Sequence, residues 1–413
     1  MASHHQIRPG VFVHLQQFHR EVVLTGEKSG KPPRRFFDKL KLFVSVNPFG
    51  KRSTGRSRKF HTFVIPKHGG WVSLTAKSME NATESAVADA AKHLRSLSSG
   101  LNQVLFGQEE LIDLVITGVL ARGHILLEGL PGLGKTELVK GLSKLLKLGT
   151  KRVQFTPDLL PGDITGNPVL QEVDGRREFV FQPGPLFTNI VLADEINRAS
   201  PKTQSALLEA MQERRVTVLG KTHDLPKPFF VLATQNPIEL EGTYPLPEAQ
   251  LDRFLFKLEV TRNDVATLQR IVSHRELGTE PQVDPVMSAE TLDSLLELVR
   301  RIYLPDVVAN YIARLVDGSH PGQSAAARGI RYGASPRAAL ALASGAKARA
   351  LMHERTHASF EDVKAIAPAV LRHRIVLDYN ARVEGHTTND IVRTLLEEIP
   401  FQAAATPKIL KPA

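Results

Sequence analysis

The pattern of hydrophobic and polar positions changes near residue 262. Before it, short apolar runs typical of buried strands alternate with helical stretches such as 82–120 and 201–214. After it, the periodicity is almost wholly helical. The strand-like runs are 124–128, 152–155, 190–193 and 229–233, and the later helical stretches are 264–277, 288–302, 306–316, 336–353, 360–373 and 389–398. Strands that alternate with helices favour a parallel sheet flanked by helices. We therefore predict an α/β domain over 79–262 and an all-helical domain over 263–413.

Two segments of the α/β domain predict β-hairpins. Residues 168–181 carry an Asp-Gly pair at 174–175 between two strand-like runs, which is a strong turn signal. Residues 215–225 repeat this arrangement around Gly220. We expect both hairpins to be insertions into the α/β domain.

Composition narrows the class of protein. The chain has 413 residues, of which 42% are hydrophobic and 23% charged, as is usual for soluble globular proteins. An uncharged apolar run of the roughly 20 residues that a membrane helix needs is absent, and the N-terminus lacks the apolar core of a secretory signal. The chain has no cysteine, which excludes disulfides and thiolate metal sites. We expect a cytoplasmic protein.

The net charge of +10 comes from the first 78 residues. Of the 53 Lys/Arg and 43 Asp/Glu in the chain, residues 1–78 hold 15 and three, which leaves 38 basic and 40 acidic residues for 79–413. Composition therefore gives no argument for nucleic-acid binding by the main body. Residues 1–78 show no sustained periodicity. A basic disordered arm, an organellar transit peptide and an over-extended gene model in which translation begins at Met79 all fit them.

A glycine-rich loop follows the first strand-like run and precedes a helix. It satisfies G-x-x-x-x-G-K-[ST], the phosphate-binding loop (P-loop) of many nucleotide-binding proteins. Glycines let phosphate oxygens approach backbone N–H groups, and the helix adds its positive N-terminal end. We expect Lys135 to contact the β- and γ-phosphates of ATP and the Thr136 hydroxyl to bind Mg²⁺. The predicted nucleotide-binding residues are Gly129, Leu130, Pro131, Gly132, Leu133, Gly134, Lys135 and Thr136.

Polar residues end two further apolar runs. Asp194 and Glu195 follow 190–193, about 55–60 residues after the glycine loop. Asp194 would lie beside Mg²⁺, and Glu195 would polarise the attacking water. Asn236 follows 229–233 and would hydrogen-bond that water or the γ-phosphate. An ordinary turn residue before Pro237 is the alternative for Asn236.

From 82 to 400 the sequence resembles the MoxR family of AAA+ ATPases. The match lies in the glycine loop and in several further segments: 107–109, 155–166, 194–204, 208–213, 233–237, 246–254 and 333–337. The resemblance implies an α/β P-loop AAA+ core, a parallel sheet with inserted hairpins, and a helical lid. It further implies that the hairpins lie near the central pore of a ring. The first would touch the substrate through Glu172, Arg176, Arg177 and Phe179, with an edge hairpin of no such role as the alternative.

The resemblance also assigns roles to single residues. Gly107 and Gln108 join the nucleotide-binding set, and Asn236 matches the first sensor of the γ-phosphate. Arg253 matches the arginine finger that reaches the neighbouring subunit, with Arg198 as a rival. Arg337 matches the second sensor, which we expect to serve its own subunit. Guanidinium groups suit these roles because charge spreads over the phosphoryl oxygens in the transition state.

The resemblance implies a homo-oligomer, a hexameric ring with active sites between subunits. It would use ATP and Mg²⁺ to remodel, mature or activate a protein client, together with a von Willebrand factor A-domain partner. Three alternatives stay open: a nucleic-acid-remodelling motor, a magnesium-chelatase-type ATPase subunit, and a nucleotide-binding scaffold that does not hydrolyse ATP. Nothing in the sequence names the client, and the resemblance leaves a membrane association undecided.

Overall fold

The computed structural model describes residues 60–67, 70–77, 81–173, 176–237, 242–276, 279 and 281–401. Contacts divide the chain into two units, residues 1–80 and 81–413. In the first unit, β1 (Phe60–Lys67) and β2 (Gly70–Lys77) form an antiparallel hairpin with Phe60 opposite Lys77. Although residues 1–78 show no sustained periodicity, these two segments form strands, and they are rich in the β-branched and aromatic residues that favour strands. The rest of the basic leader lies outside the described residues.

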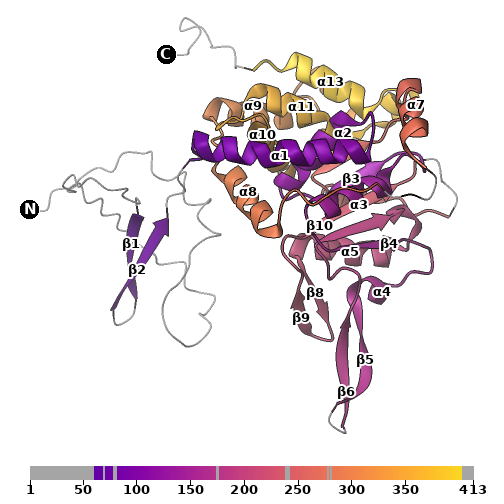
Figure 1. The fold of residues 1–413 in the computed structure, drawn as a ribbon. Coiled ribbons are helices and arrows are strands. Elements are labelled where there is room, and N and C mark those ends of the chain that lie inside the picture. Colours follow the sequence, from indigo (N-terminus) through magenta and orange to yellow (C-terminus); the bar gives the residue numbers. More distant parts are fainter. Residues whose placement is uncertain are drawn as a thin grey trace, which may run out of the picture. The chain divides into compact units, whose positions relative to one another are not determined.

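A five-stranded parallel sheet forms the centre of the second unit (Figure 1). All neighbouring strands are parallel, in the order β11-β3-β10-β7-β4. The sheet confirms the predicted α/β class, although β11 was not among the predicted strands. The strands are β3 (Ile125–Glu128), β4 (Thr150–Gln154), β7 (Ile190–Asp194), β10 (Phe230–Gln235) and β11 (Phe256–Glu259).

The central strands are buried on both faces. Successive side chains of a strand point to opposite faces, and alternate residues of β7 and β10 accordingly enter two different hydrophobic clusters. Ile190 and Leu192 join the cluster that includes α1, α2 and the lid helices, whereas Val191 and Ala193 join the one that includes α5. The sheet thus forms the middle layer of three. The core helices are α1 (Glu84–Val104), α2 (Glu109–Leu120), α3 (Lys135–Leu145), α4 (Pro161–Thr165), η3 (Ile196–Arg198), α5 (Pro201–Glu213) and α6 (Glu248–Leu251).

Both predicted hairpins are present in the core. β5 (Gly166–Val173) pairs with β6 (Arg176–Pro183), and β8 (Arg215–Val218) pairs with β9 (Lys221–Asp224). Leu219 and Gly220 between β8 and β9 both have positive φ, 49° and 75°, as the tight turns that match strand twist require. Figure 1 shows β5 and β6 projecting well beyond the sheet.

The region after the sheet is mainly helical, as predicted. Side chains cap its helix starts: Ser288, Ser335, Ser359 and Thr387 each accept a backbone N–H of the first turn. Two very short strands and one short helix escaped the periodicity analysis because they span only two to five residues. The elements are α7 (Val265–His274), α8 (Ala289–Arg301), α9 (Asp306–Gly318), η4 (Ala326–Gly329), β12 (Ile330–Tyr332), α10 (Pro336–Met352), α11 (Phe360–Leu371), β13 (Val376–Leu377), α12 (Tyr379–Val383) and α13 (Thr388–Glu398). Within the described residues, no helix is both long enough and apolar enough to cross a membrane.

Candidate nucleotide site

The polar residues predicted from sequence lie at one edge of the sheet. β3, β10 and β7 are neighbours and parallel, so their carboxyl ends meet at this edge. β3 continues into the glycine loop, β10 into the buried Asn236, and β7 ends in Asp194. The Gly129 N–H donates to the carbonyl of Gln235 at 3.3 Å, which ties the start of the loop to the end of β10. The edge of a parallel sheet at its strand ends is where ligands bind in open α/β folds.

The glycine loop requires glycine for its backbone shape. Gly134, directly before α3, has φ +81°, and a Cβ there would lie 2.5 Å from Leu105 Cδ1. Gly132 also has φ +81°, in open space. Side chains rarely adopt this conformation. The N-terminal end of α3 leaves its first N–H groups without intrahelical acceptors, which makes it suited to an anion.

Lys135, the first residue of α3, lies over this loop. Its Nζ donates to the Gly129 carbonyl at 2.6 Å. Burial lowers the pKa of Lys135 from its ordinary value, while the nearby carboxylates of Asp194, Glu195 and Glu128 act in the opposite direction. The amine is thus partly desolvated and close to the acids that end β7. A phosphate oxygen beside the Lys135 amine would replace the interactions with water that the amine loses on burial.

Asp194 is fixed by two neighbours that the sequence analysis did not single out. Thr234 Oγ1 donates to Asp194 Oδ1 at 2.6 Å, and the Arg152 guanidinium donates twice to Oδ2, at 2.6 and 3.1 Å. Thr234 lies on β10 and Arg152 on β4, the two strands that flank β7. Their positions, one and two residues before the ends of β10 and β4, were the available signal, but only the strand order shows that they face Asp194.

Glu195 has a backbone conformation that is uncommon for a non-glycine residue. Its φ is +55°, directly after β7, and its N–H donates to Thr234 Oγ1 at 2.8 Å. Its carboxylate Oε2 accepts from Gln154 Nε2 at 2.7 Å and from Arg198 Nη1 at 3.0 Å. Residues held in sparsely populated backbone regions cluster at functional sites. The Thr234 hydroxyl therefore contacts both acids: it donates to the Asp194 carboxylate and accepts from the Glu195 backbone N–H.

A cavity of about 420 Å³ lies on the β11 side of the glycine loop. Gly107 and Gln108 line it, together with the start of α2, the end of β11 and part of α11. It adjoins the loop because the Val260 N–H, directly after β11, donates to the Glu128 carbonyl at 2.7 Å. Gln108 is buried, and its amide donates to the Thr261 carbonyl at 3.1 Å. The two residues that the resemblance added to the nucleotide set thus lie beside the loop.

The two arginines assigned by resemblance lie near the opposite end of β3. The Leu255 N–H donates to the carbonyl of His124, five residues before Gly129, which at about 3.3 Å per residue is roughly 16 Å from the loop. Arg253 lies two residues before Leu255, and Arg337 Nη1 lies 3.8 Å from Asp252 Oδ2. Arg337 thus lies beside Asp252, before the start of β11, whereas the sequence analysis expected it at the phosphates of its own subunit. The helical periodicity of the sequence could not predict the position of Arg337, because that position depends on how the lid docks on β11.

Family models match both halves of this architecture. Residues 124–256 match the model described as ATPase family associated with various cellular activities, and residues 322–395 match the AAA lid domain. Chaperone MoxR1 of Mycobacterium tuberculosis is 38% identical over 325 residues, which cover 76% of this chain and 85% of that protein. The chain belongs to the MoxR family of AAA+ ATPases. The family is chaperone-like, in keeping with the name of MoxR1.

Two further similarities agree with this membership. The uncharacterized protein YeaC of Bacillus subtilis is 44% identical over 308 residues, which cover 74% of this chain and 94% of that protein. A solved structure of a presumed ATPase from Cytophaga hutchinsonii is 39% identical with a TM-score of 0.72, covering 77% of this chain and 97% of that one. The AAA+ fold, with its parallel sheet and helical lid, is therefore shared along nearly the whole of these relatives.

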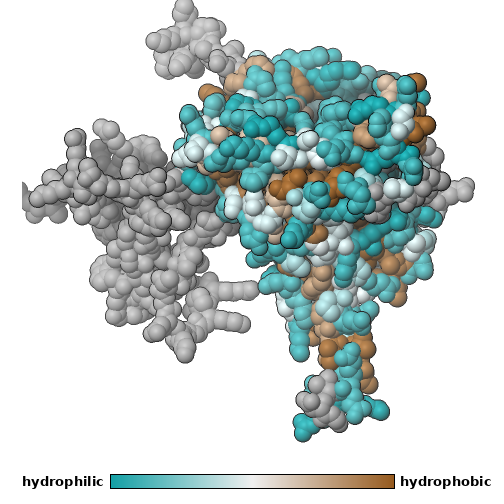
Figure 2. Space-filling model, in the orientation of Figure 1, coloured by the Kyte–Doolittle hydropathy of each residue, from teal (hydrophilic) through white to brown (hydrophobic). Residues whose placement is uncertain are grey.

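The β5–β6 hairpin of this MoxR-family chain exposes hydrophobic side chains. Val169, Leu170 and Phe179 are exposed on it, with Phe179 at 69%. Figure 2 shows hydrophobic residues along the projecting hairpin, away from the body of the unit. At its base, Phe181 stacks on His223 of β9 with ring centroids 4.0 Å apart, so the two hairpins contact each other. The turn residues 174 and 175 lie outside the described residues.

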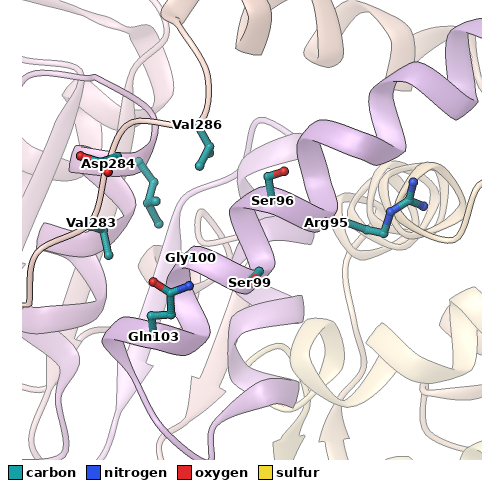
Figure 3. Close-up of a pocket in the computed structure, with 9 residues that line it drawn as sticks. Arg95, Ser96, Ser99, Gly100, Gln103, Val283, Asp284 and Val286 are labelled. Carbon is teal, nitrogen blue, oxygen red and sulfur yellow. The ribbon is translucent and has the colours of Figure 1, made fainter. Parts of the chain in front are cut away.

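A second cavity, of about 500 Å³, lies away from the glycine loop. Figure 3 shows it between α1 and the segment that carries Val283, Asp284 and Val286. Leu145, which also lines it, is ten residues along α3 from Lys135, about 15 Å at 1.5 Å per residue. Its one arginine, Arg95, is paired with Glu354 of the lid. Although larger, this cavity has no phosphate-binding loop, so the smaller one is the better candidate for a nucleotide.

The Mg²⁺ expected from sequence has oxygen ligands available. The Thr136 hydroxyl stands in the first turn of α3 and the Asp194 carboxylate ends β7, and both are hard oxygen donors of the kind Mg²⁺ takes. Within the described ranges, three or more His, Asp or Glu side chains nowhere gather to hold a metal by themselves. Mg²⁺ commonly binds through one or two protein oxygens and takes its other ligands from phosphates and water. The donor set therefore fits Mg²⁺ bound together with a nucleotide.

Proposed function

We propose that this chain binds and hydrolyses ATP, with Mg²⁺, at sites completed by the next copy of the chain in a hexameric ring. The observation that carries the proposal is the convergence of the glycine loop, Asp194, Glu195 and Asn236 on three neighbouring strand ends. The adenine base would enter the 420 Å³ cavity beside Gly107 and Gln108. Backbone N–H groups of the loop and the Lys135 amine would hold the phosphates.

Thr136 and Asp194 would hold Mg²⁺, which neutralises phosphate charge when bound. Asp194 is kept in place for this by the Thr234 hydroxyl. The other carboxylate oxygen of Asp194, Oδ2, accepts a hydrogen bond from Arg152 on the neighbouring strand β4. Arg152 thus balances the carboxylate charge in a buried strand end.

Glu195 and Asn236 would orient the attacking water. Glu195 is held on its backbone side by Thr234 and on its carboxylate side by Gln154 and Arg198. A carboxylate fixed in this way accepts the water proton without first reorganising. Arg198 reaches the acid of its own chain, which supports Arg253 over Arg198 as the residue that acts on a neighbour.

Arg253 and Arg337 would both act on the neighbouring copy's nucleotide. Arg253 and Asp252, which Arg337 contacts, both precede β11, at the end of that strand away from the glycine loop, and this position supports a role on a neighbour. In a head-to-tail ring, the surface of one copy that carries Arg253 and Arg337 would face the surface of the next copy that carries the glycine loop. A guanidinium supplied from a neighbour can accelerate phosphoryl transfer by several orders of magnitude.

The client would be a protein, engaged by the β5–β6 hairpin. Exposed Phe179 and the adjoining Arg176 and Arg177 on a projecting hairpin support such a contact. A von Willebrand factor A-domain partner and a cytoplasmic location belong to the same proposal, which for these points rests on family membership. The client's identity is not part of it, because one fold serves many clients.

Mixing inactive variants tests the shared site. Arg253→Ala should bind ATP but not hydrolyse it, and Glu195→Gln should bind ATP and retain it. Mixed in equal amounts, they should regain roughly a quarter of wild-type turnover, because that share of interfaces joins an intact nucleotide side to an intact arginine. Absence of rescue in rings shown by native mass spectrometry to contain both variants would refute the shared site. Wild-type protein that neither binds nor hydrolyses ATP with Mg²⁺ would refute the whole proposal.

A further inference from the structure

One carboxylate, that of Asp252, joins the core to three groups of the lid. Ser335 Oγ lies 3.1 and 2.9 Å from its two oxygens, and Arg374 Nε donates to Oδ1 at 2.8 Å. Arg337 Nη1 lies 3.8 Å from Oδ2. Asp252 also directly precedes Arg253 in the chain. Whatever fixes Asp252 therefore fixes the backbone from which Arg253 extends.

The two arginines on Asp252 differ in how tightly they are held. The Arg374 side chain is only 3% exposed, and it also donates to the carbonyls of Asp252, Phe254 and Leu255. It thereby clamps the segment on both sides of Arg253. Arg337 is about half exposed and has a longer contact. Arg374 is thus a fixed part of the structure, whereas Arg337 keeps donors for another partner.

Arg253 also has unused hydrogen-bonding capacity. Its Nε is buried and has no hydrogen-bond partner. A buried unpaired donor costs free energy unless a ligand or partner satisfies it. Asp252 thus contacts the Arg337 guanidinium through its carboxylate and is joined to Arg253 through the backbone. Arg374 provides the buried counter-charge.

We propose that Asp252 is a positioning residue that presents Arg253 and Arg337 as a pair to the phosphates of the neighbouring copy. The proposal rests on the proposed function, in which these arginines act between copies. Because Asp252 belongs to the core and its partners to the lid, a shift of the lid on the core would change the contact between Asp252 and Arg337. The role lies on the arginine side of the interface and leaves the chain's own nucleotide loop untouched.

Mixing experiments locate the defect of Asp252→Asn. The variant keeps the shape of the side chain and removes its charge. We expect unchanged binding of a fluorescent ATP analogue, and a kcat lower by roughly 10- to 100-fold, as small misplacements of catalytic groups produce. Turnover should rise when the variant is mixed with Glu195→Gln, which supplies an intact arginine side. It should not rise with Arg253→Ala, which is defective on the same side.

The other outcomes overturn the inference. An unchanged kcat, rescue by both partners, rescue by neither, or rescue by Arg253→Ala alone would each show that Asp252 does not act through the arginine pair. Asp362→Asn is the matched control, since Asp362 is a buried acid bonded to Arg355 at 2.6 and 2.8 Å within the lid. It should lower thermal stability without this pattern of rescue. The mixture of Arg253→Ala with Glu195→Gln tests the proposed function separately.

Discussion

His124 makes the stability of this protein depend on pH. It lies directly before β3 and is buried, with Nδ1 accepting the Val231 N–H at 3.0 Å and Nε2 3.0 Å from the Met211 carbonyl. Since Nδ1 accepts, Nε2 carries the proton and donates, so the neutral ring satisfies both neighbours. Burial lowers the pKa of His124 from 6.5 to about 4. The ring therefore resists the protonation that the unfolded chain undergoes readily.

The direction and magnitude of the pH dependence of stability follow from the different proton binding of the folded and unfolded chain. Between pH 6.5 and 4 the unfolded chain binds a proton at His124 that the folded chain does not, so stability rises with pH in this window. The difference of about 2.5 pKa units corresponds to about 3 kcal/mol at 1.36 kcal/mol per unit. This contribution is fully present above pH 6.5. It is lost as pH falls toward 4, below which both states are protonated.

The His124→Gln variant isolates the effect. Its amide can accept from Val231 and donate to Met211 but cannot titrate. Urea unfolding followed by circular dichroism at pH 7 and pH 4 should show a loss of unfolding free energy about 3 kcal/mol smaller for the variant than for the wild type. His93→Gln, at an exposed position on α1, should follow the wild type. Parallel pH profiles for His124→Gln and wild type would refute the reasoning.

Three further predictions concern the site and its supports. Arg374→Met should cost about 3–5 kcal/mol in urea unfolding because it breaks a largely buried ion pair and leaves three backbone carbonyls without their donor. Arg337→Ala should change stability by less than about 1 kcal/mol yet abolish turnover in an ATPase assay. Thr234→Val should lower kcat roughly tenfold, about 1.4 kcal/mol, with nucleotide affinity unchanged in a fluorescence titration, because both acids lose a hydrogen-bond partner. Gly134→Ala should weaken ATP binding at least about tenfold by calorimetry, since a side chain at φ +81° strains the loop.

The nucleotide end could be read from sequence because its information is local. The loop from Gly129 to Thr136 is contiguous, and Asp194 and Glu195 end a run whose burial is visible in its composition. Parallel strands bring their carboxyl ends to one edge, so contiguous motifs suffice to place these groups together. The sequence did not indicate a role for Thr234 or Arg152, because neither residue stands at a strand end. Only the order β10-β7-β4 shows that they flank Asp194 from the two sides.

The arginine end could not be read in the same way. Arg337 begins a lid helix more than 80 residues after Asp252, and neither the helical periodicity nor the Pro336 start tells on which side of the sheet that helix lies. The side is decided by the long-range bonds of Arg374 and Ser335 to the segment before β11. These bonds place Arg337 beside the residue that precedes Arg253, before the start of β11. An arginine that cannot reach the phosphates of its own chain has a role in hydrolysis only if a second copy brings phosphates to it. If Arg337 takes part in hydrolysis, as the resemblance implies, the docking of the lid favours a role on a second copy.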